Sequence, residues 1–284
     1  DLAFLDRAIA VTERNRLLLT DFVRIAQTKY SVGTGLQQDV LKAQVSHSEL
    51  RDKLIVLRNK RRRVEALLNV ALNRMPQSPV GRPAEVEQTP FALSVEGLQE
   101  MALMERARLR RLAALTRKWQ AAEDVARLSH RPDFNANLGY RQRDFDSDPV
   151  KGSDFVTMGI TLNLPIHRGS NQDQQVQQAL SMRNASEAWY AAAKQQIFLE
   201  IQQNHIDVQT HREQASLYGS SIIPQAEQAL AAALAAYQVD KVEFITLLNS
   251  QVTLLNLEIK LYHHLTEGEK SLAKLEAVVG KRLN

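Results

Sequence analysis

The sequence predicts a mainly α-helical protein in which a long antiparallel helical hairpin occurs twice, with a single β-hairpin between the two copies. Apolar residues recur at steps of three and four through most of the chain, and one central stretch alternates with a period of two. The segment YSVGTGLQQDVLKAQV at 30–45 also returns as YQVDKVEFITLLNSQV at 237–252. The composition agrees, because 44% of the residues are apolar but only 6% are aromatic, as in long helices that pack in narrow seams.

The first helical hairpin is predicted over residues 1–74. Apolar side chains recur one turn apart in residues 1–30, and the same spacing resumes after the turn SVGTG. A 3.5-residue repeat kept for about five heptads predicts antiparallel coiled-coil packing across a tight tip. We expect the second helix to end near Met75, before a stretch rich in proline and glycine. The predicted seam positions, with His47 and Arg61 on the same face, are Leu5, Ile9, Leu19, Val23, Ala26, Tyr30, Leu36, Val40, Ala43, Leu50, Leu54, Leu57, Val64, Leu68 and Ala71.

Residues 75–130 are predicted to hold a loop followed by one helix. The loop covers 75–92, and the helix covers 94–130 with arginine-rich faces. The helix should end before Pro132, because a residue that precedes proline avoids helical geometry.

A β-hairpin is predicted within residues 131–168. In DFNANLGYRQR and FVTMGITLNLP every second residue is apolar and the others are small or polar, and a turn-rich segment joins the two runs. Each run has about the length of a tilted barrel strand that crosses a bilayer. A hairpin packed on a soluble core shows the same alternation. Taken alone, the alternation slightly favours this soluble interpretation, and the membrane interpretation also stays open at this point.

The second helical hairpin is predicted over residues 169–284. Ser170 and Asp173 form a capping box that begins a long helix, and Pro224 should kink it. The segment YQVDKVEF then forms the second tip, and a leucine-rich helix completes the hairpin. At an offset of 207 residues the two copies share Tyr30/Tyr237, Val32/Val239, Leu41/Leu248, Gln44/Gln251, Val45/Val252, Leu50/Leu257, Lys53/Lys260 and Leu54/Leu261. A β-hairpin precedes the second copy only, so we expect this chain to be the C-terminal part of a longer protein.

Several classes of function find no support in the sequence. The chain has no cysteine, and its seven histidines form no metal-binding or di-iron motif. It also lacks a nucleophile elbow, a P-loop and a dinucleotide fingerprint, so we predict neither enzymatic activity nor a cofactor. The basic runs near 58–63 and 106–111 have no interleaved aromatic residues, which favours a solvated helix face over nucleic-acid binding.

The chain resembles the TolC-like outer-membrane efflux proteins in three features. It has duplicated long helical hairpins with Y-x-V tips, a strand pair between them, and the segment LNLPIHRG leading into a helix. The segments RPDF, LGY and GITLNLP are most similar to the heavy-metal, CzcC-like branch. The resemblance covers essentially the whole chain, and the order of tip, β-hairpin, long helix and tip is its most specific part.

The resemblance implies a homotrimer whose strands close a β-barrel in the bacterial outer membrane and whose helices form a periplasmic tunnel. It further implies an exit duct that passively conducts substrate, here heavy-metal cations, from a periplasmic adaptor and an inner-membrane RND-type pump. A drug-efflux duct, a type I secretion duct and a coiled-coil scaffold protein are the alternatives. Within this scheme 1–74 and 169–284 are periplasmic hairpins, 75–130 is equatorial, and 131–168 is a transmembrane hairpin.

The resemblance also assigns roles to particular residues. The side chains that face outer-membrane lipid would be Phe134, Leu138, Tyr140, Met158, Ile160 and Leu162. The adaptor-contacting tips would be Val32, Gly33, Thr34, Gly35, Leu36, Val239, Asp240, Lys241 and Val242. Asp39 and Tyr237 match positions that close the tunnel through a hydrogen bond between neighbouring helices. The alternative is that Tyr237, like Tyr30, simply packs the tip. Val242, Thr246 and Asn249 replace an arginine and two aspartates of well-known members, which argues against a cation-binding constriction.

Overall fold

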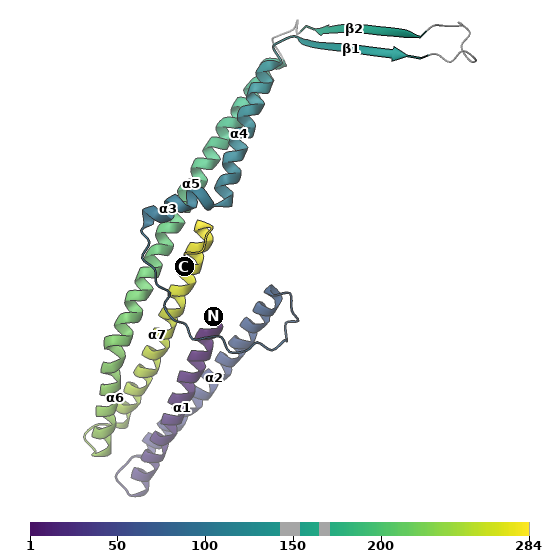
Figure 1. Cartoon of the computed structure of the whole chain (residues 1–284). Helices are drawn as coiled ribbons and strands as arrows, with labels where there is room; N and C mark the ends of the chain where they lie inside the picture. Colours follow the sequence, from purple (N-terminus) through teal and green to yellow (C-terminus); the bar gives the residue numbers. More distant parts are fainter. Residues whose placement is uncertain (143–153, 165–170, 284) are drawn as a thin grey trace. The chain divides into compact units, whose positions relative to one another are not determined.

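The computed structural model describes residues 1–142, 154–164 and 171–283, and its elements are labelled in Figure 1. The chain forms two compact units. One unit combines residues 1–98 with 200–284, and the other contains residues 99–199. Each unit is described by itself below.

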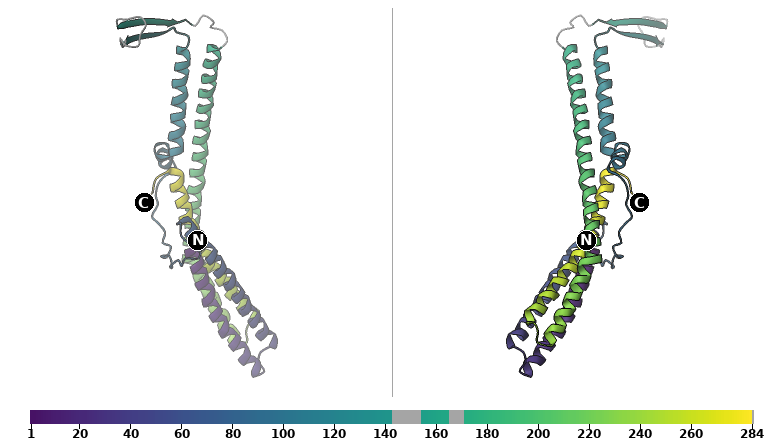
Figure 2. Two further views of the ribbon diagram at one scale, coloured as in Figure 1. Left: turned by 90° about the vertical axis from the view of Figure 1, so that its right-hand side faces the viewer. Right: turned by 90° about the vertical axis from the view of Figure 1, so that its left-hand side faces the viewer.

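Two antiparallel helical hairpins make up most of the first unit. Helices α1 (Leu2–Ser31) and α2 (Gln37–Ala71) form one hairpin, and α6 (Ile223–Gln238) and α7 (Phe244–Val279) form the other. The hairpins lie side by side in Figure 1 and one behind the other in the turned views of Figure 2, and α1 packs against α7. The expected pair of helical hairpins is therefore present.

The core of this unit lies between the two hairpins. Its largest fully buried side chains include Leu19 and Phe22 of α1 and Phe244 and Leu247 of α7. The buried Gln251 side chain donates a hydrogen bond of 2.9 Å to Asn15 Oδ1 across the α1–α7 contact. Buried polar pairs of this kind fix the register of packed helices.

The predicted seam is wrong at its ends. Tyr30 and Leu36 are 48% and 65% exposed, because they flank the turn where no helix faces them. Leu68 and Ala71 are also exposed, since in an antiparallel pair the last turn of α2 extends past Leu2, the first residue of α1. The middle of the seam is confirmed, and Val40, Ala43, Leu50 and Leu54 are buried.

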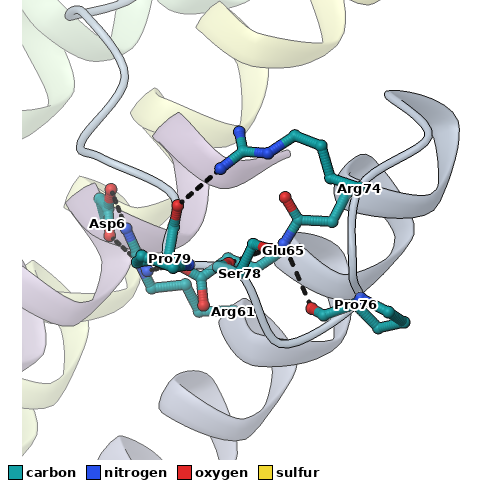
Figure 3. Close-up of polar contacts among 8 residues, drawn as sticks. Asp6, Arg61, Glu65, Arg74, Pro76, Ser78 and Pro79 are labelled. Carbon is teal, nitrogen blue, oxygen red and sulfur yellow. Dashed lines mark hydrogen bonds and ion pairs between the residues drawn. The ribbon is translucent and has the colours of Figure 1, made fainter.

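The C-terminal end of α2 is joined to the rest of the unit by polar contacts, drawn in Figure 3. Arg61 donates to the carboxylates of Asp6 on α1 and Glu65 on its own helix. The Asn69 side-chain amide donates to the carbonyl oxygens of Pro76 and Ser78, at 3.2 and 2.7 Å. Helix α2 ends at Ala71, slightly before the end predicted near Met75. The Asn69 contacts hold the segment that follows the helix against its last turn.

The long helix that leads to the second tip is interrupted by a π-helical turn. Helix α5 (Gln172–Leu217) is followed by η1 (Tyr218–Ile222) and then by α6, in which Pro224 lies in the first turn. Proline has no N–H to offer the carbonyl four residues earlier, and its ring crowds that carbonyl, so a local π turn accommodates it. The kink predicted at Pro224 thus takes the form of a π turn. At the other end of α5, Ser170 of the expected capping box lies outside the described residues.

Residues 94–130 form two helices, not the single helix that was expected. Helix α3 (Val95–Glu105) ends before Arg106, whose backbone is extended (φ −67°, ψ 111°), and α4 (Ala107–Leu128) begins after it. The periodicity continues across Arg106, which explains why the sequence did not reveal the break.

In the second unit, Glu123 of α4 accepts hydrogen bonds from Arg127 and from Arg183 of α5.

The expected β-hairpin is present, and both of its faces are exposed. Strands β1 (Asp133–Arg141) and β2 (Phe155–Asn163) pair antiparallel. Their register places Leu138 opposite Met158 and Phe134 opposite Leu162, so the apolar residues of both strands share one face. Leu138 and Met158 are 77% and 76% exposed, which is inconsistent with a hairpin buried on a soluble core. Parts of the predicted 131–168 segment, namely 143–153 and 165–168, lie outside the described residues.

No helix within the described ranges combines the length and the apolar character that a membrane-spanning helix needs.

Candidate functional site at the helical tips

The two tips repeat the same backbone geometry at the offset of 207 residues. Val32 and Val239 each end a helix with similar dihedral angles, and Gly33 (φ 78°) and Asp240 (φ 58°) each follow in the left-handed region. One residue further on, the Thr34 and Lys241 amides each donate a 2.9 Å hydrogen bond back into the preceding helix. The equivalence continues to the far ends, because Asn73 and Gly280 both have positive φ. The duplication inferred from sequence is therefore a duplication of structure.

The first tip depends on a close approach of the backbone to itself. A Cβ atom placed on Gly35 would lie 2.8 Å from Lys29 Cβ and 3.0 Å from the Tyr30 amide nitrogen. The Gly35 amide also donates to the Lys29 carbonyl oxygen at 3.0 Å. Glycine is therefore required at position 35 for steric reasons.

A groove of about 430 Å³ brings most of the predicted tip residues together. Its lining includes Thr34, Gly35, Leu36 and Asp39 from the first tip, and Tyr237, Asp240, Lys241 and Val242 from the second. The other predicted tip residues, Val32, Gly33 and Val239, do not line it. Val32 and Val239 are instead 67% and 61% exposed.

Lys29 joins the two hairpins at this groove. Its side chain is only 12% exposed, forms an ion pair with Asp240, and lies over the ring of Tyr237 at 5.1 Å from the ring centroid. An ammonium group that contacts both a carboxylate and an aromatic face gains from both interactions. Sequence reasoning missed Lys29, because its partners belong to the other copy and only the packing of the two hairpins brings them together.

Tyr237 is buried beside Phe244, with the ring centroids 5.4 Å apart in an edge-to-face arrangement. Burial raises the pKa of its hydroxyl to about 12, and the carboxylates of Asp39 and Asp240 add to the increase. The hydroxyl has no hydrogen-bond partner among the described residues. The expected hydrogen bond between Tyr237 and Asp39 is thus not made within one chain, although both side chains line the groove.

Asp39 lies at the start of α2 and is partly buried. Burial raises the pKa of its carboxyl above the ordinary value, Lys42 opposes this change, and Glu243 adds to it. The groove therefore carries charges of both signs.

Thr246 and Asn249, which replace aspartates of the resembled family, are exposed on α7.

Among the described residues, no group of three or more His, Asp or Glu side chains is placed to hold a metal ion.

A repeated pair of long helical hairpins with adjoining tips, together with an exposed β-hairpin that has one apolar face, is the architecture of outer-membrane channels of known structure. The chain belongs to the outer membrane efflux protein family, whose sequence model matches residues 98–281. The family resemblance and the outer-membrane location predicted from the sequence are confirmed. A search of curated proteins found no match to this chain.

Solved structures of outer-membrane channels share this fold. VceC from Vibrio cholerae is 19% identical with a TM-score of 0.81, and the alignment covers 100% of this chain and 68% of VceC. CusC is 15% identical with a TM-score of 0.80, covering 99% of this chain and 66% of CusC. The CmeC outer-membrane channel of Campylobacter jejuni is 16% identical with a TM-score of 0.74, covering 99% of this chain and 60% of CmeC. This chain therefore spans roughly two thirds of the length of these channels.

Proposed function

We propose that this chain is part of the exit duct of a tripartite efflux pump, which passively conducts substrate across the bacterial outer membrane. The observation that carries the proposal is the β-hairpin. Its six predicted lipid-facing side chains are all exposed on one face, and its strands of nine residues have the length that crosses a bilayer when tilted. An apolar face of this kind is stable in lipid and costly in water.

The homotrimer that the resemblance implies is supported by the unequal environments of the two repeats. Leu248 and Gln251 of α7 are buried, whereas their equivalents on α2, Leu41 and Gln44, are exposed. The face of α7 that packs against α1 thus has a counterpart on α2 that no described residue of this chain covers. By repeat symmetry, that face of α2 packs against α6 of a neighbouring copy, and barrel closure of the strands removes their open edges.

The tips are proposed to contact the periplasmic adaptor, which links the duct to an inner-membrane RND-type pump. Exposed apolar side chains at the turns support this role, because Val32, Leu36 and Val239 are each more than 60% exposed. The remaining contact residues of the proposed surface are Gly33, Thr34, Gly35, Asp240, Lys241 and Val242.

Asp39 and Tyr237 are proposed to help close the tunnel at the tips. The Tyr237 hydroxyl is buried with no hydrogen-bond partner in the part of the chain that the structure describes, and such a group costs about 1–3 kcal/mol. A partner from a neighbouring copy in the closed trimer would satisfy it.

Replacing Tyr237→Phe tests this role. We expect the conductance of the channel in planar bilayers to rise, because the closed state loses a hydrogen bond while the packing against Phe244 remains. Tyr30→Phe is the matched control, since Tyr30 is the sequence equivalent and is exposed. Unchanged conductance in Tyr237→Phe would show that this tyrosine only packs the tip.

The proposed cargo is heavy-metal cations, on the basis of the sequence resemblance to the CzcC-like branch. Drug efflux and type I secretion use the same architecture and remain the alternatives, whereas the coiled-coil scaffold does not explain the exposed hairpin. Membership in a family of channels is also consistent with the non-enzymatic character predicted from the sequence.

The function is tested by deleting the full-length gene and measuring growth with and without complementation. We expect sensitivity to one or more of the Zn, Co, Ni, Cd, Cu and Ag salts. Sensitivity confined to dyes and detergents would move the protein to drug efflux. Unchanged growth under both sets of compounds would contradict the efflux proposal.

A further inference from the structure

Two histidines from different helices meet beside the π turn, far along the sequence from either tip. His211 of α5 and His264 of α7 place their Nδ1 atoms 3.3 Å apart, with ring centroids separated by 5.5 Å. Tyr218 of the π turn lies against His264, with the ring centroids 5.3 Å apart. The tip groove uses none of these residues.

The close approach of α5 and α7 holds the two imidazoles together. A Cβ atom placed on Gly268 would lie 3.5 Å from His211 Cβ, so α7 passes His211 at van der Waals distance. Both rings are partly buried, which limits the positions that they adopt. Single-turn π segments inside helices are found disproportionately at functional sites.

The spacing of the two nitrogens suits a shared cation. Imidazole nitrogens bind Zn²⁺ at about 2.0–2.1 Å, and two ligands in tetrahedral positions at that distance are about 3.3 Å apart. The same spacing permits a hydrogen bond in which one neutral imidazole donates to the other. A cation can take the place of this hydrogen bond when the donating ring moves its proton from Nδ1 to Nε2, so that both imidazoles stay neutral and keep their positions.

We propose that His211 and His264 form a two-histidine site for a divalent transition-metal cation of the Zn²⁺, Ni²⁺ or Co²⁺ type, with water completing the coordination. Imidazole is a preferred ligand of these ions. Because the described residues supply two protein ligands and no group of three, binding is exchangeable, and its effect is to connect α5 to α7 beside the π turn. The proposal does not depend on which solute the channel conducts.

The charged groups around the pair set its strength. Lys260 lies one turn before His264 on α7 and opposes a bound cation. Glu267 lies one turn after His264, but its carboxylate is ion-paired with Lys270 at 2.8 Å. Arg212, next to His211, donates instead to the carbonyl oxygens of Thr89 and Phe91. His263 is exposed, and its ring contacts both Phe4 and His264, at centroid distances of 5.8 and 5.6 Å.

The test measures binding of Co²⁺ and Zn²⁺ alone to the purified full-length channel, above the ordinary pKa of histidine. We expect one ion per chain, a visible Co²⁺ spectrum typical of nitrogen ligation, and a higher midpoint of thermal unfolding with metal present. His211→Ala and His264→Ala should each weaken binding by about tenfold or more. His263→Ala should bind as the wild type does.

Circular dichroism of each variant checks that its helices are intact, and His211→Asn provides a polar replacement if His211→Ala does not fold. Wild-type affinity in His211→Ala, or in His211→Asn, would overturn the proposal. Failure of the unmodified channel to bind either ion would overturn it as well.

Discussion

Replacing Leu138→Arg in β1 is expected to prevent assembly of the channel in the outer membrane. Leu138 lies near the middle of its strand, opposite Met158, and is 77% exposed on the apolar face. An arginine on the lipid face near the bilayer midplane costs about 2–4 kcal/mol, and a homotrimer would incur this cost three times. We expect trimers to disappear from outer-membrane fractions and from native gels in detergent.

Thr161→Arg is the matched control for this experiment. Thr161 pairs with Asn135 on the small, polar face of the same hairpin, so its replacement adds the same charge on the side that would face water. It should assemble as the unmodified protein does. Equal assembly of both variants would contradict a lipid-facing role for Leu138 and would reopen the soluble interpretation of the hairpin.

Replacing Val32→Asp and Val239→Asp together is expected to weaken binding of the adaptor strongly. The two valines occupy equivalent positions at the two tips, with similar backbone angles and high exposure. Burial of one valine side chain contributes about 1.5–3 kcal/mol, so losing both weakens the Kd by at least about a hundredfold. Each single variant should lose an intermediate amount.

Binding of the purified adaptor to immobilised trimers measures this effect. Val125→Asp serves as the control, because Val125 is comparably exposed at 66% but lies on α4, outside both tips. The trimer itself should persist in all variants. Adaptor affinity that stays within about twofold of the wild type in the double variant would show that the tip valines do not contact the adaptor.

The sequence predicted the helical hairpins and the β-hairpin because each has a period that local geometry imposes on its side chains. It did not predict the break at Arg106, since the helical period continues through it on both sides. The sequence located the disruption at Pro224 but did not predict its form. The proline shows that one backbone N–H donor is missing, but it does not show how the neighbouring carbonyl groups are accommodated. Lys29 was missed because its partners, Asp240 and Tyr237, are more than 200 residues away in the chain.

What the sequence by itself determined is the repeat: its offset, its turns and the faces of its helices. What only the tertiary structure decided is the environment of each copy. Tyr30 and Tyr237 are equivalent in sequence, yet the first is exposed and the second is buried beside Phe244. Gln44 is likewise exposed, whereas Gln251 is buried and bonded to Asn15. The physical reason is that periodicity specifies which face of a helix is apolar, while burial depends on which helix packs against that face.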